Sequence, residues 1–187
     1  MAVGDSYSGK EGERQGAPEF ETLVDLHYES LFRFAMSLAH AESDAADLVQ
    51  DTFVTWAEKG HQLQDPGKAK SWLFTTLHRR FLERQRRITR FPEVDIDSMM
   101  ENLPEADPEL VNRLDGGELV RLLERVDPQF KGAVALFYLE DCSYAEIGEI
   151  LEIPLGTVKS RIARGLAQLR ALVMRGPTGT RSRGGTP

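Results

Sequence analysis

The chain has a single cysteine, Cys142, which excludes an intramolecular disulfide and any zinc site built from several cysteines. No apolar run approaches the roughly 20 residues that a membrane helix requires. The first segment, MAVGDSYSGKEGERQG, lacks the apolar core of a secretory signal. Phosphate-binding, zinc-protease and nucleophile-elbow motifs are also missing. We therefore expect a cytoplasmic protein that does not insert into the membrane, is not an enzyme and needs no cofactor or metal ion.

Isolated reactive side chains do not change this expectation. The 4 histidines are scattered, and we interpret each as a structural or surface residue. Cys142 precedes Ser143 at an expected helix start, where the pKa of a thiol can be lowered. The interpretation we favour is a semi-buried thiol without a chemical role.

Charge is distributed unevenly along the chain. The formal net charge is −7, which by itself argues against nucleic-acid binding. Residues 61–90, however, contain 8 basic and 2 acidic side chains, and residues 156–187 contain 7 basic side chains and no acidic one. The remaining segments are acidic. Such a chain can meet a polyanion at two places and present acidic surface elsewhere.

Apolar residues recur at helical spacing through most of the chain. One stripe runs from Phe20 to Leu38, and a second helix is expected after Ser43, a favourable N-cap residue. A third helix spans roughly Lys68 to Arg90. Because no stretch alternates with a period of two, the sequence predicts an all-α fold.

Composition divides the chain into two small helical domains. Residues 1–17, rich in glycine, serine and charge, are predicted to be a disordered arm, followed by an N-terminal domain over 18–90. Residues 91–115 are acidic, contain three prolines and are predicted to be a flexible linker. A second domain follows over 116–175, and residues 176–187 are predicted to be a disordered tail.

The second domain ends in the pattern of a helix-turn-helix. Ser143 and Glu146 match an S-x-x-E capping box, which opens a short helix through Leu151. The segment EIPLG ends that helix, and a basic helix follows from about Leu155 to Val173.

At 100° per residue, this last helix has a buried seam and a polar face. The seam is formed by Val158, Ile162, Leu166, Leu169 and Val173. The opposite face carries Thr157, Ser160, Arg161, Arg164 and Gln168. Arginine can bind guanine with two hydrogen bonds, and hydroxyl and amide groups can read base edges or hold phosphates. Lys159 and Arg170 flank this face, where they could reach backbone phosphates. We therefore predict that this helix contacts DNA.

The residues around this helix are specific enough to indicate a family. The string DCSYAEIGEILEIPLGTVKSRIARGLAQLR resembles the promoter-recognising C-terminal domain of extracytoplasmic-function (ECF) sigma factors, in the sigma-70 superfamily of bacterial RNA polymerase sigma subunits. The resemblance implies that Thr157, Lys159, Ser160, Arg161 and Arg164 contact the minus-thirty-five promoter element.

Two residues of the helix-turn-helix are expected to lower its local stability. The family usually has glycine where Glu152 stands, at a helix end where a left-handed backbone costs a non-glycine residue about 1 kcal/mol. Gly165 lies inside the basic helix, at a similar cost of about 1 kcal/mol relative to alanine. Both departures concern local stability more than function.

The first domain also resembles the family. The segment SDAADLVQDTFVTWAE (43–58) is similar to the helix that docks on the clamp of the largest catalytic polymerase subunit. Its expected inward residues are Leu48, Val49, Phe53 and Trp56. The resemblance assigns polymerase binding to the opposite face, which carries Asp47, Gln50, Asp51, Val54 and Glu58. From spacing alone, a solvated face would be the favoured interpretation.

The basic segment KAKSWLFTTLHRRFLERQRR (68–87) resembles the part of the family that recognises and melts the minus-ten element. Strand separation needs cations for phosphates and flat surfaces for unstacked bases. The predicted DNA-facing residues are Lys68, Lys70, Phe74, His78, Arg79, Arg80, Arg84 and Arg87. The loop His61–Lys70 is expected to shape a pocket for a flipped base. Trp72 could be a core residue, which its spacing favours, or a stacking platform.

The resemblance covers roughly residues 20–90 and 116–175. It implies a sigma factor that binds core RNA polymerase through its clamp and the flap of the other large subunit, directs it to a promoter and helps open the DNA. It also implies an anti-sigma factor as a partner. The alternative is a helix-turn-helix regulator that binds duplex operators without polymerase, which would leave 43–58 and 68–87 unexplained. An adaptor or anti-sigma decoy would explain the acidic faces but not two basic blocks.

Overall fold

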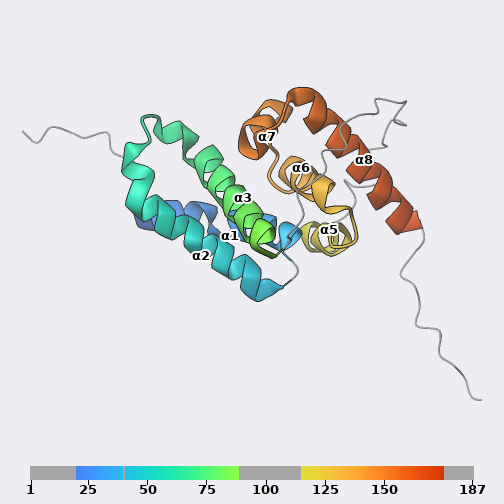
Figure 1. The fold of residues 1–187 in the computed structure, drawn as a ribbon, viewed down its shortest axis with the longest axis horizontal. Coiled ribbons are helices and arrows are strands. Elements are labelled where there is room, and N and C mark those ends of the chain that lie inside the picture. The colour runs from blue at the N-terminus through green and yellow to red at the C-terminus, as the bar shows by residue number, and fades with distance from the viewer. Residues whose placement is uncertain (1–19, 40, 89–114, 175–187) are drawn as a thin grey trace, which may run out of the picture.

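The computed structural model describes residues 20–39, 41–88 and 115–174, and in these residues helices are joined by short turns without any strand (Figure 1). The α-helices are α1 (Phe20–Leu38), α2 (Glu42–Lys59), α3 (Ala69–Ile88), α5 (Gly116–Leu123), α6 (Pro128–Tyr138), α7 (Tyr144–Leu151) and α8 (Leu155–Met174). Two 3-10 turns, η1 (Gly60–Gln62) and η2 (Pro66–Lys68), lie between α2 and α3. The predicted all-α class is confirmed.

The segments predicted to be an arm, a linker and a tail lie outside the described residues, apart from Asp115, which caps α5. No helix of the described part is both long and apolar enough to cross a membrane.

Helices α1, α2 and α3 pack into a three-helix unit, and the inward face predicted for α2 is buried. The predicted N-cap at Ser43 is wrong. The N-cap is Ala41, two residues earlier, and α2 begins at Glu42. Ala41 has an extended backbone, and its side chain makes no capping hydrogen bond. The acidic side chains of Glu42 and Asp44 lie in the first turn instead, where negative charge is favourable at the positive end of the helix dipole.

Helices α5 to α8 form the second unit, and side-chain caps set three of its helix starts. Asp115 Oδ1 accepts a hydrogen bond from the Glu118 backbone N–H at 2.6 Å. Asp127 caps α6 through Oδ1, with Pro128 at the first helical position, where the missing N–H has no cost.

The predicted capping box at the start of α7 is confirmed. The Ser143 hydroxyl oxygen accepts from the Glu146 backbone N–H at 3.3 Å, and Glu146 Oε2 accepts from the Ser143 backbone N–H at 2.8 Å. The Ser143 hydroxyl also donates to Glu146 Oε2 at 2.7 Å, and this hydrogen bond, together with the one from the Ser143 backbone N–H, lowers the pKa of Glu146. The helix ends at Glu152, whose left-handed backbone (φ 58°, ψ 41°) turns the chain toward α8.

The two units pack directly on each other (Figure 1). Helix α7 lies against α3, and α6 and α5 lie against α1. One apolar core runs through both units. The packing is close: a Cβ atom built on Gly132 of α6 would lie 3.7 Å from Leu38 of α1 and 3.4 Å from Leu151 of α7. The described residues therefore form one body, in which the surfaces of α3 and α7 that meet are covered.

Candidate promoter and polymerase interfaces

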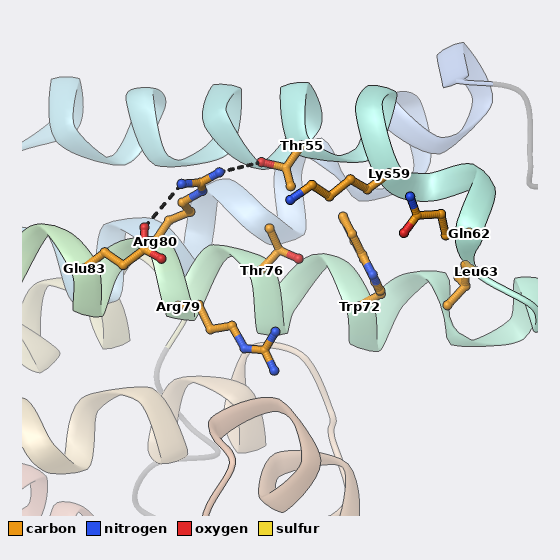
Figure 2. A pocket seen from close by; sticks show the side chains of 9 residues that line it. All are labelled: Thr55, Lys59, Gln62, Leu63, Trp72, Thr76, Arg79, Arg80 and Glu83. Carbon is orange, nitrogen blue, oxygen red and sulfur yellow. Dashed lines mark hydrogen bonds and ion pairs between the residues drawn. The ribbon is translucent and has the colours of Figure 1, made fainter.

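A pocket of about 510 Å³ opens between α2 and α3, beside the turns that connect them (Figure 2). Its walls come from Thr55, Lys59, Gln62, Leu63, Trp72, Thr76, Arg79, Arg80 and Glu83. The volume lies in the range of about 300–1,000 Å³ that small-molecule and cofactor sites occupy. The lining combines ammonium and guanidinium groups with an indole ring and hydroxyls. That combination suits an unstacked base together with its phosphate.

The indole wall of the pocket is held by a tightly packed aromatic pair. Trp72 packs edge-on against Trp56, with ring centroids 5.1 Å apart and the planes at 78°. A Cβ atom at Gly60 would lie only 2.6 Å from the Trp56 ring. The backbone of the turn after α2 can therefore lie this close to the indole only because residue 60 has no side chain. Trp72 is thus neither fully buried in the core nor an isolated surface on which a base could stack. It is partly buried, and it lines the pocket.

The cationic residues of α3 do not form one surface, and two of them face α2. Arg80 donates to Glu83 Oε2 and to the Thr55 hydroxyl, each at 3.2 Å, on the side of the pocket (Figure 2). Arg84 donates to Asp51 Oδ2 at 2.7 Å. These pairs orient the guanidinium groups of α3 over α2. A polyanion entering the pocket would compete with the carboxylates.

Other predicted DNA residues of α3 face the second unit. The Lys70 ammonium donates to the Glu140 carbonyl at 2.9 Å, and Arg79 donates to both carboxylate oxygens of Glu152 at 3.0 and 2.5 Å. Lys68 and Arg87 are exposed. Seven of the eight predicted minus-ten residues are therefore divided among the face on α2, the side toward the second unit, and solvent, and the eighth, Phe74, lies in the core.

The expected exposure of Phe74 is wrong. Its ring is fully buried and packs against the equally buried Phe34 of α1, with centroids 5.4 Å apart. Phe74 lies about 100° around the helix from Leu73 and about 60° from Leu77. Because α3 packs against α1, α2 and α7, this position also points into apolar surroundings. We therefore propose no DNA contact for Phe74.

His78 is also not on an open face. Burial lowers the pKa of His78 to about 4, with repulsion from Arg161 as the next cause and attraction to Glu152 opposing it. The ring is therefore neutral at pH 7 and lies between α3 and the helix-turn-helix. Arg161, in the second turn of α8, is therefore near enough to His78 to affect its pKa.

The face of α2 that was predicted to bind polymerase is exposed as expected. Asp47, Gln50, Asp51, Val54 and Glu58 all lie at the surface, and Val54 is 51% exposed. An exposed valine surrounded by carboxylates and an amide suits a partner that offers basic side chains around an apolar contact.

In α8 the predicted seam of Val158, Ile162, Leu166 and Leu169 is buried, whereas Val173 is only partly so. The polar face is only partly as predicted. Lys159 is exposed, and Ser160, Arg161 and Arg164 are partly buried. Thr157 is 8% exposed, so its expected outward position is wrong. Thr157 lies in the first turn of α8, where the left-handed turn folds this helix back toward α7.

Sequence reasoning missed the residues that join the two units. Glu140 is 5% exposed, and its carboxylate accepts from Arg33 of α1 at 3.3 Å. Burial raises the pKa of Glu140, against the opposing effects of hydrogen bonds and nearby cations. Periodicity within one helix carries no signal for such contacts. The only available clue was Glu152, a charged residue where the local backbone favours glycine.

Neither thiol nor metal chemistry is supported in the described residues. Burial raises the pKa of Cys142 to about 11, so the alternative of a lowered thiol pKa is wrong. No group of three or more histidine, cysteine, aspartate or glutamate residues in the described part could hold a metal ion.

A helix-turn-helix with a basic second helix, packed on a three-helix unit with a cation-lined pocket, is the architecture of a helical protein suited to binding DNA. Comparison with known families makes this specific. The model described as "Sigma-70 region 2" matches residues 23–91, and "Sigma-70, region 4" matches residues 116–169.

Curated relatives agree with this match. The chain is 35% identical to the ECF RNA polymerase sigma factor SigE of Mycolicibacterium smegmatis over 85% of this chain. It spans 63% of that relative's length, which is less than two thirds. It is 31% identical to the RNA polymerase sigma factor NccH of Alcaligenes xylosoxydans xylosoxydans, covering 82% of this chain and 86% of the relative. It is 30% identical to the ECF RNA polymerase sigma factor SigL of Mycobacterium tuberculosis, covering 79% of this chain and 85% of the relative.

Two solved structures share the fold. One is the sigma factor RpoE in complex with the anti-sigma factor NepR from Bartonella quintana, with a TM-score of 0.65, 26% identity, and coverage of 84% of this chain and 98% of that chain. The other is CnrH in complex with the cytosolic domain of CnrY, with a TM-score of 0.58 and 26% identity. The match covers 84% of this chain and 89% of that chain. The chain belongs to the ECF sigma factors of the sigma-70 family.

Proposed function

We propose that this chain binds core RNA polymerase, directs it to a two-part promoter and helps to open the DNA. The observation that carries the proposal is the order of the two units. A sigma-70 region 2 with a cation-lined pocket precedes a sigma-70 region 4 that ends in a basic helix-turn-helix. Sigma factors are initiation factors and not enzymes, and we propose no catalytic role for this chain. We place its activity in the cytoplasm, where bacterial polymerase meets promoter DNA.

Each described surface supports one part of this function. The exposed face of α2 around Val54 supports docking on the polymerase clamp. The pocket between α2 and α3 supports capture of an unstacked minus-ten base, with Arg80 and Lys59 near its phosphate. Lys159, Arg161 and Arg164 of α8 support contact with the minus-thirty-five element in the major groove. We further propose an anti-sigma partner, since the structurally similar sigma factor RpoE was solved in complex with the anti-sigma factor NepR.

Run-off transcription with purified core polymerase tests the proposed function. We expect transcripts from a cognate promoter only when this protein is added to core enzyme. Binding to a duplex operator without polymerase, together with no transcription on addition of core enzyme, would instead identify a helix-turn-helix regulator.

Replacing Arg161 by alanine is expected to weaken holoenzyme binding to the promoter by roughly 5- to 150-fold, the equivalent of about 1–3 kcal/mol for a guanidinium that contacts a base. Core polymerase binding should not change, because α2 is untouched. Gel-shift titration of the promoter and co-purification with core enzyme measure the two effects. Arg125→Ala removes an equal charge from an exposed position between α5 and α6 and should have little effect. Loss of core binding in the Arg161 variant would show that the surface is misassigned.

A further inference from the structure

The side of α8 that is open to solvent differs from the polar face that its sequence predicts. In that predicted face Thr157 is buried, and the side-chain oxygen of Gln168 accepts a hydrogen bond from the Asp127 backbone N–H at 2.9 Å. At 100° per residue the predicted face is centred about 200° from Leu155, whereas the exposed residues lie between about 0° and 160°. These exposed residues form the open edge of α8: Leu155, Gly156, Lys159, Ala167, Arg170, Ala171 and Met174.

Leu155 is a large apolar side chain at the beginning of the open edge, and it is 50% exposed. The other large apolar side chain that is exposed on α8 is Met174, at the far end of the helix. A Cβ atom built on Gly156 would have no other atom within 4 Å, so the space beside Leu155 is open. A group from outside the protein can therefore reach this leucine without displacing other residues.

The surroundings of Leu155 indicate what that group is. Helix α8 carries four basic side chains and no acidic one, which favours the approach of a polyanion. Lys159 is exposed one turn after Leu155 on the same edge, where its ammonium can bind a phosphate or a guanine. In a helix-turn-helix, the first residues of the second helix contact base edges in the major groove. Leu155 is the first residue of that helix.

The apolar group that base pairs present in the major groove is the 5-methyl group of thymine. A leucine side chain forms no hydrogen bond, so covering a polar base edge with it would leave that edge without a partner. Contact with the methyl group instead removes apolar surface of both groups from water. Building on the proposed function, we propose that Leu155 packs against the 5-methyl group of a thymine in the minus-thirty-five element and makes the protein prefer thymine at that position.

Deoxyuridine tests this contact directly, because it differs from thymidine only in lacking the 5-methyl group. Each thymine of the minus-thirty-five element, on either strand, is replaced in turn, and gel-shift titration measures the dissociation constant of the holoenzyme for the promoter duplex. We expect one replacement to weaken binding by about fourfold, the effect of burying one methyl group. The same replacement should have almost no effect on holoenzyme that contains Leu155→Ala. On the unmodified promoter, Leu155→Ala should itself weaken binding by at least about fourfold.

Three further variants separate this contact from a general loss of apolar surface or of folding. Leu155→Met keeps a long apolar side chain and should retain the methyl effect. Leu155→Gln keeps the length without the apolar character and should lose the methyl effect, so it repeats the test with a second side chain. Met174→Ala is the matched control, since Met174 lies about 28 Å from Leu155 along the helix axis and its loss should leave the methyl effect at about fourfold.

Salt dependence provides an independent readout. The methyl effect should be equal at low and high salt, since neither the leucine nor the methyl group is charged. The loss of binding caused by Lys159→Ala should instead decrease as the salt concentration rises, because this side chain contributes through its charge. A methyl effect that disappears at high salt would contradict an apolar contact.

The contact is refuted if deoxyuridine has no effect on the unmodified protein at any position, or weakens the unmodified protein and Leu155→Ala equally. A protein that transcribes in the run-off assay without a methyl effect would overturn this contact alone. A protein that gives no transcript with core polymerase would overturn the proposed function, and the contact with it.

Discussion

Replacing Phe74 by alanine is expected to lower the free energy of unfolding by about 3–5 kcal/mol, the usual cost of truncating a buried phenylalanine. The ring is fully buried against Phe34, where α3 crosses α1. Truncation would leave a cavity in the core that the two units share. Since small domains are stable by only about 5–15 kcal/mol in total, this loss would remove a large fraction of the free energy of unfolding and lower the melting temperature. Urea denaturation followed by circular dichroism measures the change.

Two controls separate a core role of Phe74 from a DNA role. Phe74→Leu keeps an apolar side chain of similar size and should retain most of the stability and the transcription activity. Leu26→Ala removes an apolar side chain that is 70% exposed and should change stability little. If Phe74→Ala were as stable as the unmodified protein but failed to open a promoter, the ring would contact DNA after all. The sequence pattern alone could not have distinguished these outcomes.

Replacing Gly165 by alanine is expected to destabilise the second unit, although alanine is the better helix former. A Cβ atom at this position would overlap a γ-methyl of Val134 and lie 3.2 Å from Phe130 Cβ. Val134 is fully buried and branched at Cβ, so it cannot rotate away. Overpacking costs about 1–3 kcal/mol, which exceeds the gain of up to about 1 kcal/mol in helix propensity. The melting temperature should fall by several degrees, and Gly165→Val should have a larger effect.

Gly156→Ala is the matched control in the same helix. Nothing lies within 4 Å of a Cβ atom built there, so this substitution should be neutral or stabilising. A rise in melting temperature for Gly165→Ala would show that α6 and α8 are not this close. The glycine inside α8 thus looks like a weakness from the sequence, whereas the structure shows that it permits the close contact between the two helices.

Helix positions and the two-unit organisation could be predicted from the sequence, because both depend on neighbours along the chain. The capping box at Ser143 and Glu146 and the seam from Val158 to Leu169 follow from spacing of three and four residues. The start of α2 was misplaced by two residues, because the helix begins after an alanine without a side-chain cap, and acidic side chains in its first turn interact with the helix dipole instead. The left-handed turn at Glu152 was also expected, because the position resembles one where glycine is usual.

The sequence by itself determined that this protein is an all-α chain with an acidic α2 face, a basic α3 and a basic helix-turn-helix, because composition and periodicity are local properties. Only the tertiary structure decided which residues of α3 and α8 are covered. Phe74 and Thr157 are buried, and Lys70 and Arg79 are bound to the second unit, because α6 and α7 pack against α1 and α3. Such contacts join residues about 70 positions apart in sequence, and helical spacing contains no information about them.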